Sequence, residues 1–555
     1  MVYKSLVLSF ALGLLLVIPG YSLLSLTGKL KKHGNFFSLS LPRIILTSFF
    51  ISIGSYALIA IVFSYLSVPF GKVWLIWLVL GGLTLVTARQ DLPYLTSQIR
   101  RLLLSRWNIC SILVILAAFI ILSVQGGLLD RLADGWWHMA YANQMILENS
   151  AWISHHPLVG KELRSPSILY PPIWHTNLAL LSSGLGIALP VIWHAIAGPI
   201  VVFTCLAFFL LVDSLTKSPK ICFLSLVLLL FLVGGLNSYM RVSPWPANIA
   251  YIGLYFALSE TFRVSDALET RTSTSYLRLF RIGPGHTLLH LVGIGALGFL
   301  LIGLHGVEAV LYLFAITAYL VGLSLTKEIH SAPKFQIERT FLFWLIATVL
   351  AFGFLFAFLF LRGYLAGLLL LPKSKAPYLN FFVPTILGTF IIVLAWINCS
   401  GHRSSEKGFW KAAWWVTWIG LALLLIAVVD FSHISALFAP EDYGRHVPRA
   451  FTERFGNRVW LPWWDHQLRG AFLFSGLVGI FCAIFAFTKE RTRATIFIFA
   501  NTALVILILT SPYLFSMSSF LIPLGSTYRV HMLLFTPISI AILLSYMLPA
   551  DDPSR

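Results

Sequence analysis

The sequence predicts an all-α polytopic integral membrane protein with about 13 to 15 transmembrane helices. Three observations predict this fold class. Of the 555 residues, 58% are hydrophobic and 11% are charged, whereas about a quarter of the residues in soluble domains are charged. Apolar runs of about 17 to 25 residues recur along the chain, and each can cross a hydrocarbon core about 30 Å thick. Most lysines and arginines stand in short segments between these runs.

The first apolar run follows Lys4, and we interpret it as a retained helix because no small-residue cleavage site follows it. A second run comes soon after it, which also favours a membrane span over a signal peptide. The expected spans, in chain order, are residues 5–23, 43–66, 71–88, 108–124, 190–213, 221–236, 247–260, 286–303, 307–325, 340–361, 380–397, 412–429, 469–487, 494–513 and 529–547.

The net charge of +18 does not indicate a nucleic-acid partner, because the basic residues fit the positive-inside rule of membrane proteins. Segments containing Lys29, Arg100, Lys217 and Arg493 are placed on the cytoplasmic side, and alternation then places the N-terminus outside and the C-terminus inside. These inner segments contain no glycine-rich phosphate loop, which argues against a nucleotide-driven enzyme. The expected partners include membrane lipids and exclude nucleic acids.

The first large outer loop, residues 125–189, concentrates polar and aromatic residues. Within "DGWWHMAYANQMILE", Asp134 and His138 are four residues apart, so on a helix they share one face. We interpret this segment as an amphipathic helix on the membrane surface, with Asp134 and His138 as candidate catalytic residues. Asp130, at the end of the preceding span, is the competing carboxylate. The alternative is that Asp134 only caps the helix and the tryptophans belong to the aromatic belt.

A second feature of this loop is "ILYPPIWHTNLALL". Pro171 and Pro172 cannot lie inside a regular helix, so the sequence predicts a break with Tyr170 and His175 beside it, facing the outer surface. Both residues are candidates for binding substrate. The alternative interpretation is a simple helix start.

Two further candidate binding groups lie near predicted membrane boundaries. His305 and Glu308, in "IGLHGVEAVLY", are three residues apart on one helical face, and ionisable groups at such depth mark sites or mutually satisfied structural pairs. Tyr528 and Arg529, in "GSTYRVHMLLF", stand at the outer mouth of the last span. An arginine there either extends to lipid headgroups or presents a fixed fork to a phosphate.

Together these motifs resemble the GT-C superfamily of membrane glycosyltransferases. The resemblance rests on a span that ends in an outer loop with an aspartate and an amphipathic helix, then "YPPIWH", a span that closes on "LVDSLTKSPK", and a terminal "YR" span. It covers most of residues 108–325 and roughly the last fifty residues. The first three spans, with "LLLVIPGYSLLSLTGKL", resemble the leader of some bacterial members. We therefore expect a three-helix leader (1–107), a catalytic core (108–325) and a C-terminal transmembrane region (326–555).

The resemblance implies an activity. A sugar passes, with inversion, from a polyprenyl-phosphate or polyprenyl-diphosphate carrier to a hydroxyl of a glycan, lipid or protein, at the outer face of the bacterial cytoplasmic membrane. The family's outer-loop aspartate corresponds to Asp134, with Asp130 second, and its phosphate-binding arginine to Arg529. Many members carry an acidic pair directly after the first core span, whereas "RLA" separates the two aspartates here, so the choice of base stays open. No cofactor is expected, and no metal ligand set is recognised.

Other classes of protein remain as alternatives. A secondary transporter would place charged or broken helices near the bilayer midplane and repeat its architecture in two halves, and the sequence has no clear internal repeat. A polysaccharide polymerase or ligase would use a large outer loop such as residues 430–468, where "YGRHVPRAF" supplies Arg445, His446 and Arg449. A structural membrane scaffold leaves the grouping of acids and histidines on one side unexplained.

Overall fold

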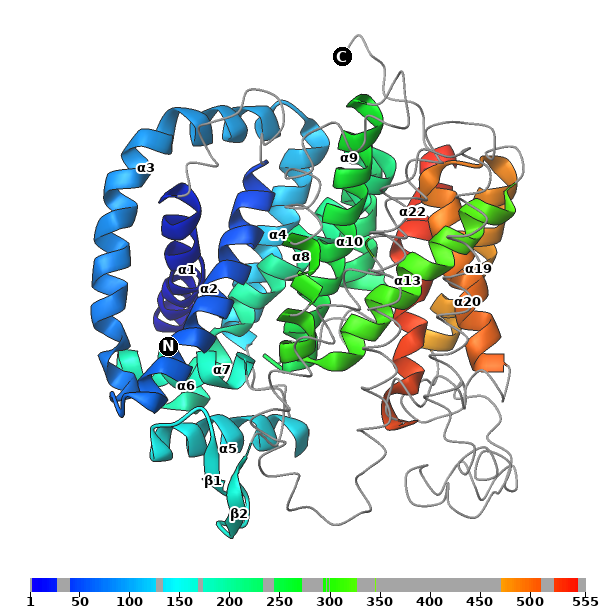
Figure 1. Cartoon of the computed structure of the whole chain (residues 1–555). Helices are drawn as coiled ribbons and strands as arrows, with labels where there is room; N and C mark the ends of the chain where they lie inside the picture. The colour runs from blue at the N-terminus through cyan, green and yellow to red at the C-terminus, as the bar shows by residue number, and fades with distance from the viewer. Residues whose placement is uncertain are drawn as a thin grey trace, which may run out of the picture.

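The computed structural model describes residues 2–26, 40–125, 133–167, 173–232, 244–271, 293–326 without 296 and 299, 345, 471–510 and 524–547. The described part is a helical bundle with one small β-hairpin (Figure 1). Its helices are α1 (Val2–Leu26), α2 (Leu41–Tyr65), η1 (Phe70–Lys72), α3 (Val73–Leu103), α4 (Arg106–Gln125), α5 (Ala133–Glu148), α6 (Ile173–Leu185), α7 (Leu189–Ala195), α8 (Ala197–Thr216), α9 (Pro219–Val227), η3 (Leu228–Leu232), α10 (Pro246–Arg271), α13 (Gly306–Leu325), α19 (Ala471–Lys489), α20 (Arg493–Thr510), η10 (Leu524–Leu534) and α22 (Thr536–Met547).

Six segments of the described chain are long and apolar enough to cross a membrane, which agrees with a multi-pass integral membrane protein. They are Tyr3–Leu26, Leu41–Tyr65, Arg106–Val124, Leu189–Thr216, Gly306–Leu325 and Arg529–Met547. Each corresponds to an expected span. The expected spans 380–397 and 412–429 and the outer loop 430–468 lie outside the described residues.

Two expected spans are interrupted. The span expected at 190–213 divides into α7 and α8, and the span expected at 529–547 divides into η10 and α22. The second break falls at Phe535, whose φ of 47° lies in the left-handed region. A non-glycine residue there ends regular helix geometry, because its Cβ crowds the backbone.

A proline in α1 determines how α1 packs on α2. Pro19 has no N–H, so the carbonyl of Leu15 loses its intrahelical donor. The hydroxyl of Tyr56, in α2, donates to that carbonyl at 2.7 Å. The next amide, of Gly20, donates at 2.8 Å to the hydroxyl of Ser52 in α2. Side chains of α2 thus satisfy the backbone groups at the proline, as burial in lipid requires.

Gly20 also permits the close approach of the two helices. A Cβ at this position would meet the carbonyl oxygen of Ser48 well inside 3.0 Å, a separation that real Cβ atoms essentially never show. We expect Gly20→Ala to lower the free energy of unfolding by about 3 kcal/mol, the upper part of the usual overpacking range. The matched control is Gly81→Ala in α3, where an added Cβ meets nothing within 4 Å. Unfolding in mixed detergent measures both variants, and equal stabilities would contradict the predicted clash.

Ion pairs identify one end of the bundle, here named the basic end. Glu260, in the second half of α10, accepts from Arg43 at 2.8 Å and from Arg263 at 2.6 Å. Asp266, one and a half turns further along α10, pairs with Lys217 at 2.7 Å and with Arg493. These contacts join the start of α2, the end of α8 and the start of α20. The basic residues lie on the side that the sequence predicts to be cytoplasmic.

Helix α5 lies across the opposite end, here named the α5 end (Figure 1). Asn149, which follows α5 with a φ of 50°, fixes it to the α2–α3 connection. Its amide donates to the carbonyl of Val68 at 2.9 Å, and its carbonyl accepts from the N–H of Phe70 at 2.6 Å. Asparagine tolerates this left-handed conformation better than other non-glycine residues.

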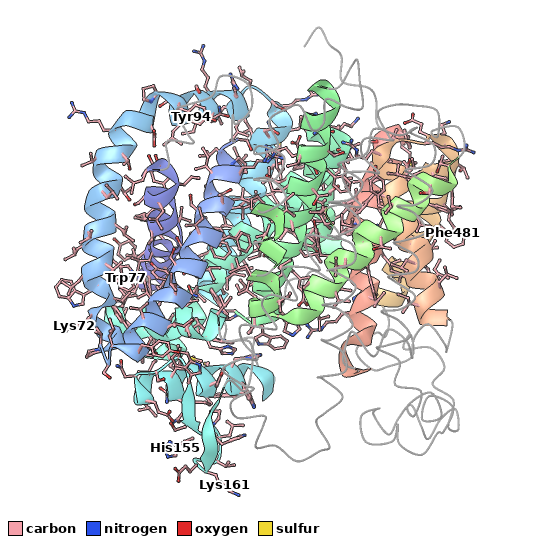
Figure 2. The ribbon with its side chains drawn as sticks, in the orientation of Figure 1. Lys72, Trp77, Tyr94, His155, Lys161 and Phe481 are labelled. Atoms are coloured by element: carbon pink, nitrogen blue, oxygen red, sulfur yellow. The ribbon has the colours of Figure 1, made fainter. Side chains whose placement is uncertain are left out.

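The chain after α5 departs from the expected all-α fold. It forms an antiparallel hairpin of β1 (Ile153–His155) and β2 (Glu162–Ser167), with a turn that uses Gly160 at a φ of 61°. Glu148 holds the hairpin to α5 by accepting from the side chain and the N–H of His155. These hydrogen bonds, with one from Gln144, outweigh burial and lower the pKa of Glu148. His155 and Lys161 lie on the part of the hairpin that projects from the bundle (Figure 2).

Candidate functional site

At the α5 end, two histidines from different helices contact each other. His138 of α5 and His175 of α6 form a ring-to-ring hydrogen bond of 3.0 Å between Nδ1 and Nε2. His175 has no exposed surface and His138 has 8%. Tyr141, one turn after His138 in α5, packs edge-on against His175 with ring centroids 4.7 Å apart. The histidine pair is therefore a packed junction between α5 and the bundle.

Helix α6 holds His175 rigidly because its neighbours are tied to two other helices. The indole N–H of Trp174 donates to the carbonyl of Pro244, just before α10, at 2.5 Å. The amide of Asn177 donates to the carbonyl of Ile53 in α2 at 3.1 Å. Both side chains are fully buried. The position of His175 is thus fixed from either side along α6.

A second group forms where α13 begins. His305 precedes the helix, and its ring is hydrogen-bonded to the carboxylate of Glu308 in the first turn. The other carboxylate oxygen of Glu308 accepts from Arg529 of η10 at 3.2 Å. Glu308 has no exposed surface, whereas the Arg529 side chain is 18% exposed. A carboxylate in the first turn is stabilised by the helix dipole as well as by its two partners.

The histidine pair and the arginine group influence each other electrostatically. The pKa of His138 is lowered to about 4, mainly because the ring is buried and in smaller part because His305 and Arg529 are near it. His138 is therefore uncharged at neutral pH, and one ring of the His138–His175 pair donates while the other accepts. Helices α5, α6 and α13 and the η10 segment thus converge on one polar cluster, here named the α5-end cluster: His138, His175, His305, Glu308 and Arg529.

The segment that carries Arg529 is not the α-helix that the sequence predicts. Residues Leu524–Leu534 form a 3₁₀ helix before the break at Phe535. Runs of 3₁₀ helix beyond three or four residues are uncommon, and they often mark functional hinges. The unusual backbone therefore lies at the residue that sequence reasoning assigns to phosphate binding.

The structure brings together five of the residues that the sequence proposes, and these five make up the α5-end cluster. The expectation that His175 faces the outer surface is wrong, because this side chain of α6 is fully buried. The expected membrane contact of α5 is also wrong for Tyr141 and Met145, which are fully buried against the bundle.

The remaining proposed residues are described in part or not at all. Asp134 lies in the first turn of α5, one turn before His138, so it is inside the helix and does not precede it as a cap. Tyr528 lies in η10, next to Arg529. The side chains of Asp134 and Tyr528, and the whole of Asp130 and Tyr170, lie outside the described residues.

Sequence reasoning missed three residues of the site: Tyr141, Trp174 and Asn177. Asn177 had a visible signal, because it is a polar amide in an otherwise apolar helix. Tyr141 and Trp174 had none, since aromatic residues at a membrane boundary usually form interface anchors.

Chemically, the α5-end cluster combines one permanent positive charge, one buried carboxylate and imidazole rings that can donate and accept hydrogen bonds. An arginine fork binds phosphate oxygens well, and imidazoles bind hydroxyl groups. Among the described residues, no three His, Cys, Asp or Glu side chains are arranged to hold a metal ion. No protein-family model matches the chain, and no curated protein is similar to it.

Proposed function

We propose that the protein is a membrane glycosyltransferase of the GT-C type. It transfers a sugar from a polyprenyl-phosphate or polyprenyl-diphosphate carrier to an acceptor hydroxyl at the outer face of the membrane. The acceptor belongs to a glycan, a lipid or a protein. The observation that carries the proposal is Arg529, held by Glu308 at the α5 end within the α5-end cluster.

The location of the cluster favours a substrate that is anchored in the membrane. Arg529 begins an apolar segment, Arg529–Met547, that is long enough to span a bilayer. A phosphate bound there lies near the membrane boundary, where the headgroup of a polyprenyl lipid is found. The cluster also lies opposite the basic end, which the positive-inside rule assigns to the cytoplasm.

The electrostatics suit a phosphate leaving group. Negative charge grows on the carrier phosphate as its bond to the sugar breaks, and a fixed guanidinium stabilises that charge. Arginine has five N–H donors, so Arg529 can bind Glu308 and a phosphate together. Because His138 is uncharged at neutral pH, it can also bind a sugar or acceptor hydroxyl without competing for the phosphate.

The reaction is a single displacement. The acceptor oxygen attacks the anomeric carbon, the bond between that carbon and the carrier phosphate oxygen breaks, and the electron pair remains on the phosphate. Asp134 takes the proton of the attacking hydroxyl, with Asp130 as the other candidate base. Because the donor is already activated, the step needs no nucleotide.

We expect Asp134→Asn to slow transfer about 100-fold, because an amide cannot accept the hydroxyl proton and general-base catalysis contributes about 10²- to 10⁴-fold. The lower value allows for Asp130, which lies four residues earlier. The measurement uses the purified protein in lipid bilayers, radiolabelled polyprenyl-phosphate sugars and acceptor-rich membrane extract. Loss of label from the carrier is followed over time.

Asp130→Asn is the matched variant. The variant with the slower sugar transfer identifies which aspartate is the base. Undiminished rates in both single variants and in the double variant would rule out both aspartates as the base. Carrier that keeps its label with the folded wild-type protein, for every sugar tried, would overturn the proposed activity itself.

A secondary transporter is a second candidate, because two observations favour it. Glu308 is fully buried in a membrane-spanning helix, and the last span is broken at Phe535. Transporters place such ionisable groups and interrupted helices at their substrate sites. The label assay distinguishes the two functions, since a transporter moves the lipid-linked sugar but leaves the label on its carrier.

A further inference from the structure

Helix α3 changes direction at the basic end. It rises beside α1 and then runs across this end of the bundle toward α4 (Figure 1). Pro93, inside the helix, accounts for the bend, because proline removes one backbone hydrogen bond and crowds the preceding turn. The part after Pro93 is about 15 Å long at 1.5 Å per residue, and Tyr94 lies on it (Figure 2).

One face of α3, just before and after Pro93, is fastened to the bundle. The carboxylate of Asp91, which is 1% exposed, accepts from the hydroxyl of Tyr21 at 3.0 Å and from that of Ser25 at 2.6 Å. Tyr94 and Leu95 pack against a small apolar cluster of α1 and α2. The segment is therefore held firmly on its inner face.

The opposite face mixes positive charge with apolar side chains. Arg89, Arg100 and Arg101 are exposed, and Leu92 and Leu103 beside them are 60% and 52% exposed. The basic residues named above at this end are paired with acids. By contrast, these three arginines make no ion pair with any described residue.

We propose that this face of α3 binds the headgroups of anionic phospholipids in the membrane leaflet at the basic end. Exposed leucines suit the acyl boundary, and arginine forks bind lipid phosphates and stay positively charged. The cytoplasmic leaflet, to which the sequence assigns this end, carries the anionic lipids that attract such segments. The site is separate from the α5-end cluster and does not depend on the proposed transfer activity.

The test uses the full-length protein in lipid nanodiscs of phosphatidylcholine with about 20 mol% phosphatidylglycerol, which supplies the negative surface potential that attracts basic segments. A trace of photoreactive phosphatidylglycerol or photoreactive phosphatidylcholine is added, and the cross-linked peptides are identified by mass spectrometry. Each arginine near an anionic surface contributes about a five-fold preference. We expect residues 89–104 to be labelled at least about ten-fold more by phosphatidylglycerol.

The variant that replaces Arg89, Arg100 and Arg101 with glutamine should lose this preference. Because the three side chains are exposed, the fold should remain intact, and an unchanged unfolding temperature verifies this. The control replaces Lys72 and Lys161 with glutamine; both are exposed and lie toward the α5 end (Figure 2). This control should keep the preference. Equal labelling by the two lipids in wild type, or a preference that survives in the triple variant, would overturn the proposal and assign the face to another partner, such as a cytosolic protein.

Discussion

Arg529→Ala should abolish sugar transfer, with a loss of about 1,000-fold or more. Removing one preorganised donor to a developing negative charge costs about 10²- to 10³-fold, and this variant removes an entire charged fork. The same loss should appear with every sugar that the wild-type protein accepts, because the carrier phosphate is common to all of them. The label assay in lipid bilayers measures it.

Two matched variants make this result specific. Arg529→Lys keeps the charge but loses the fork, so it should recover only part of the activity. Arg263→Ala removes an arginine that also pairs with a largely buried glutamate, Glu260, but at the basic end. It should leave transfer near the wild-type rate. Equal losses in Arg263→Ala and Arg529→Ala would mean that the effect reflects stability and not phosphate binding.

Glu308→Ala should destabilise the protein by about 3 to 5 kcal/mol, because removing one partner of a buried ion pair leaves the other without compensation. Glu308 is fully buried and contacts both His305 and Arg529. Its removal should also release Arg529 from its fixed position and lower transfer beyond what the loss of folded protein explains. Unfolding in mixed detergent and transfer per folded molecule measure the two effects.

Glu260→Ala separates structural loss from functional loss. Glu260 likewise binds two basic side chains, Arg43 and Arg263, so its removal should destabilise the fold by a similar mechanism. Transfer per folded molecule should nevertheless stay unchanged, because this pair lies at the other end of the bundle. If Glu308→Ala keeps full transfer per folded molecule, Glu308 has only a structural role.

The helical membrane class could be predicted from the sequence because the length and spacing of the apolar runs determine which segments can span a bilayer. It also proposed His138, His175, His305, Glu308 and Arg529 as site residues, since polar groups near a membrane boundary stand out against an apolar chain. Their sharing one site was not predictable from any local pattern. His175 and Arg529 are more than 350 residues apart in the sequence, and it is tertiary packing that pairs α5 with α6 and α13 with η10.

Other features followed from interactions that a sequence pattern does not display. The split of the last span at Phe535 depends on one backbone torsion, whereas hydropathy averages over many residues. The hairpin after α5 has only a proline and a glycine as local markers. The apolar residues of α5 predicted membrane binding, but Tyr141 and Met145 pack against other helices of the protein. Amphipathicity predicts that a face is buried, but not what buries it.

The proposed function depends most on the place where the carrier phosphate binds. The most direct measurement is an electron cryomicroscopy structure of the Asp134→Asn protein in nanodiscs with a polyprenyl-phosphate sugar. The predicted result is phosphate density within hydrogen-bond distance of the Arg529 guanidinium at the α5 end, with the sugar on the side of α5 and His138. Phosphate density at the basic end, or bound away from Arg529, would contradict the proposed site.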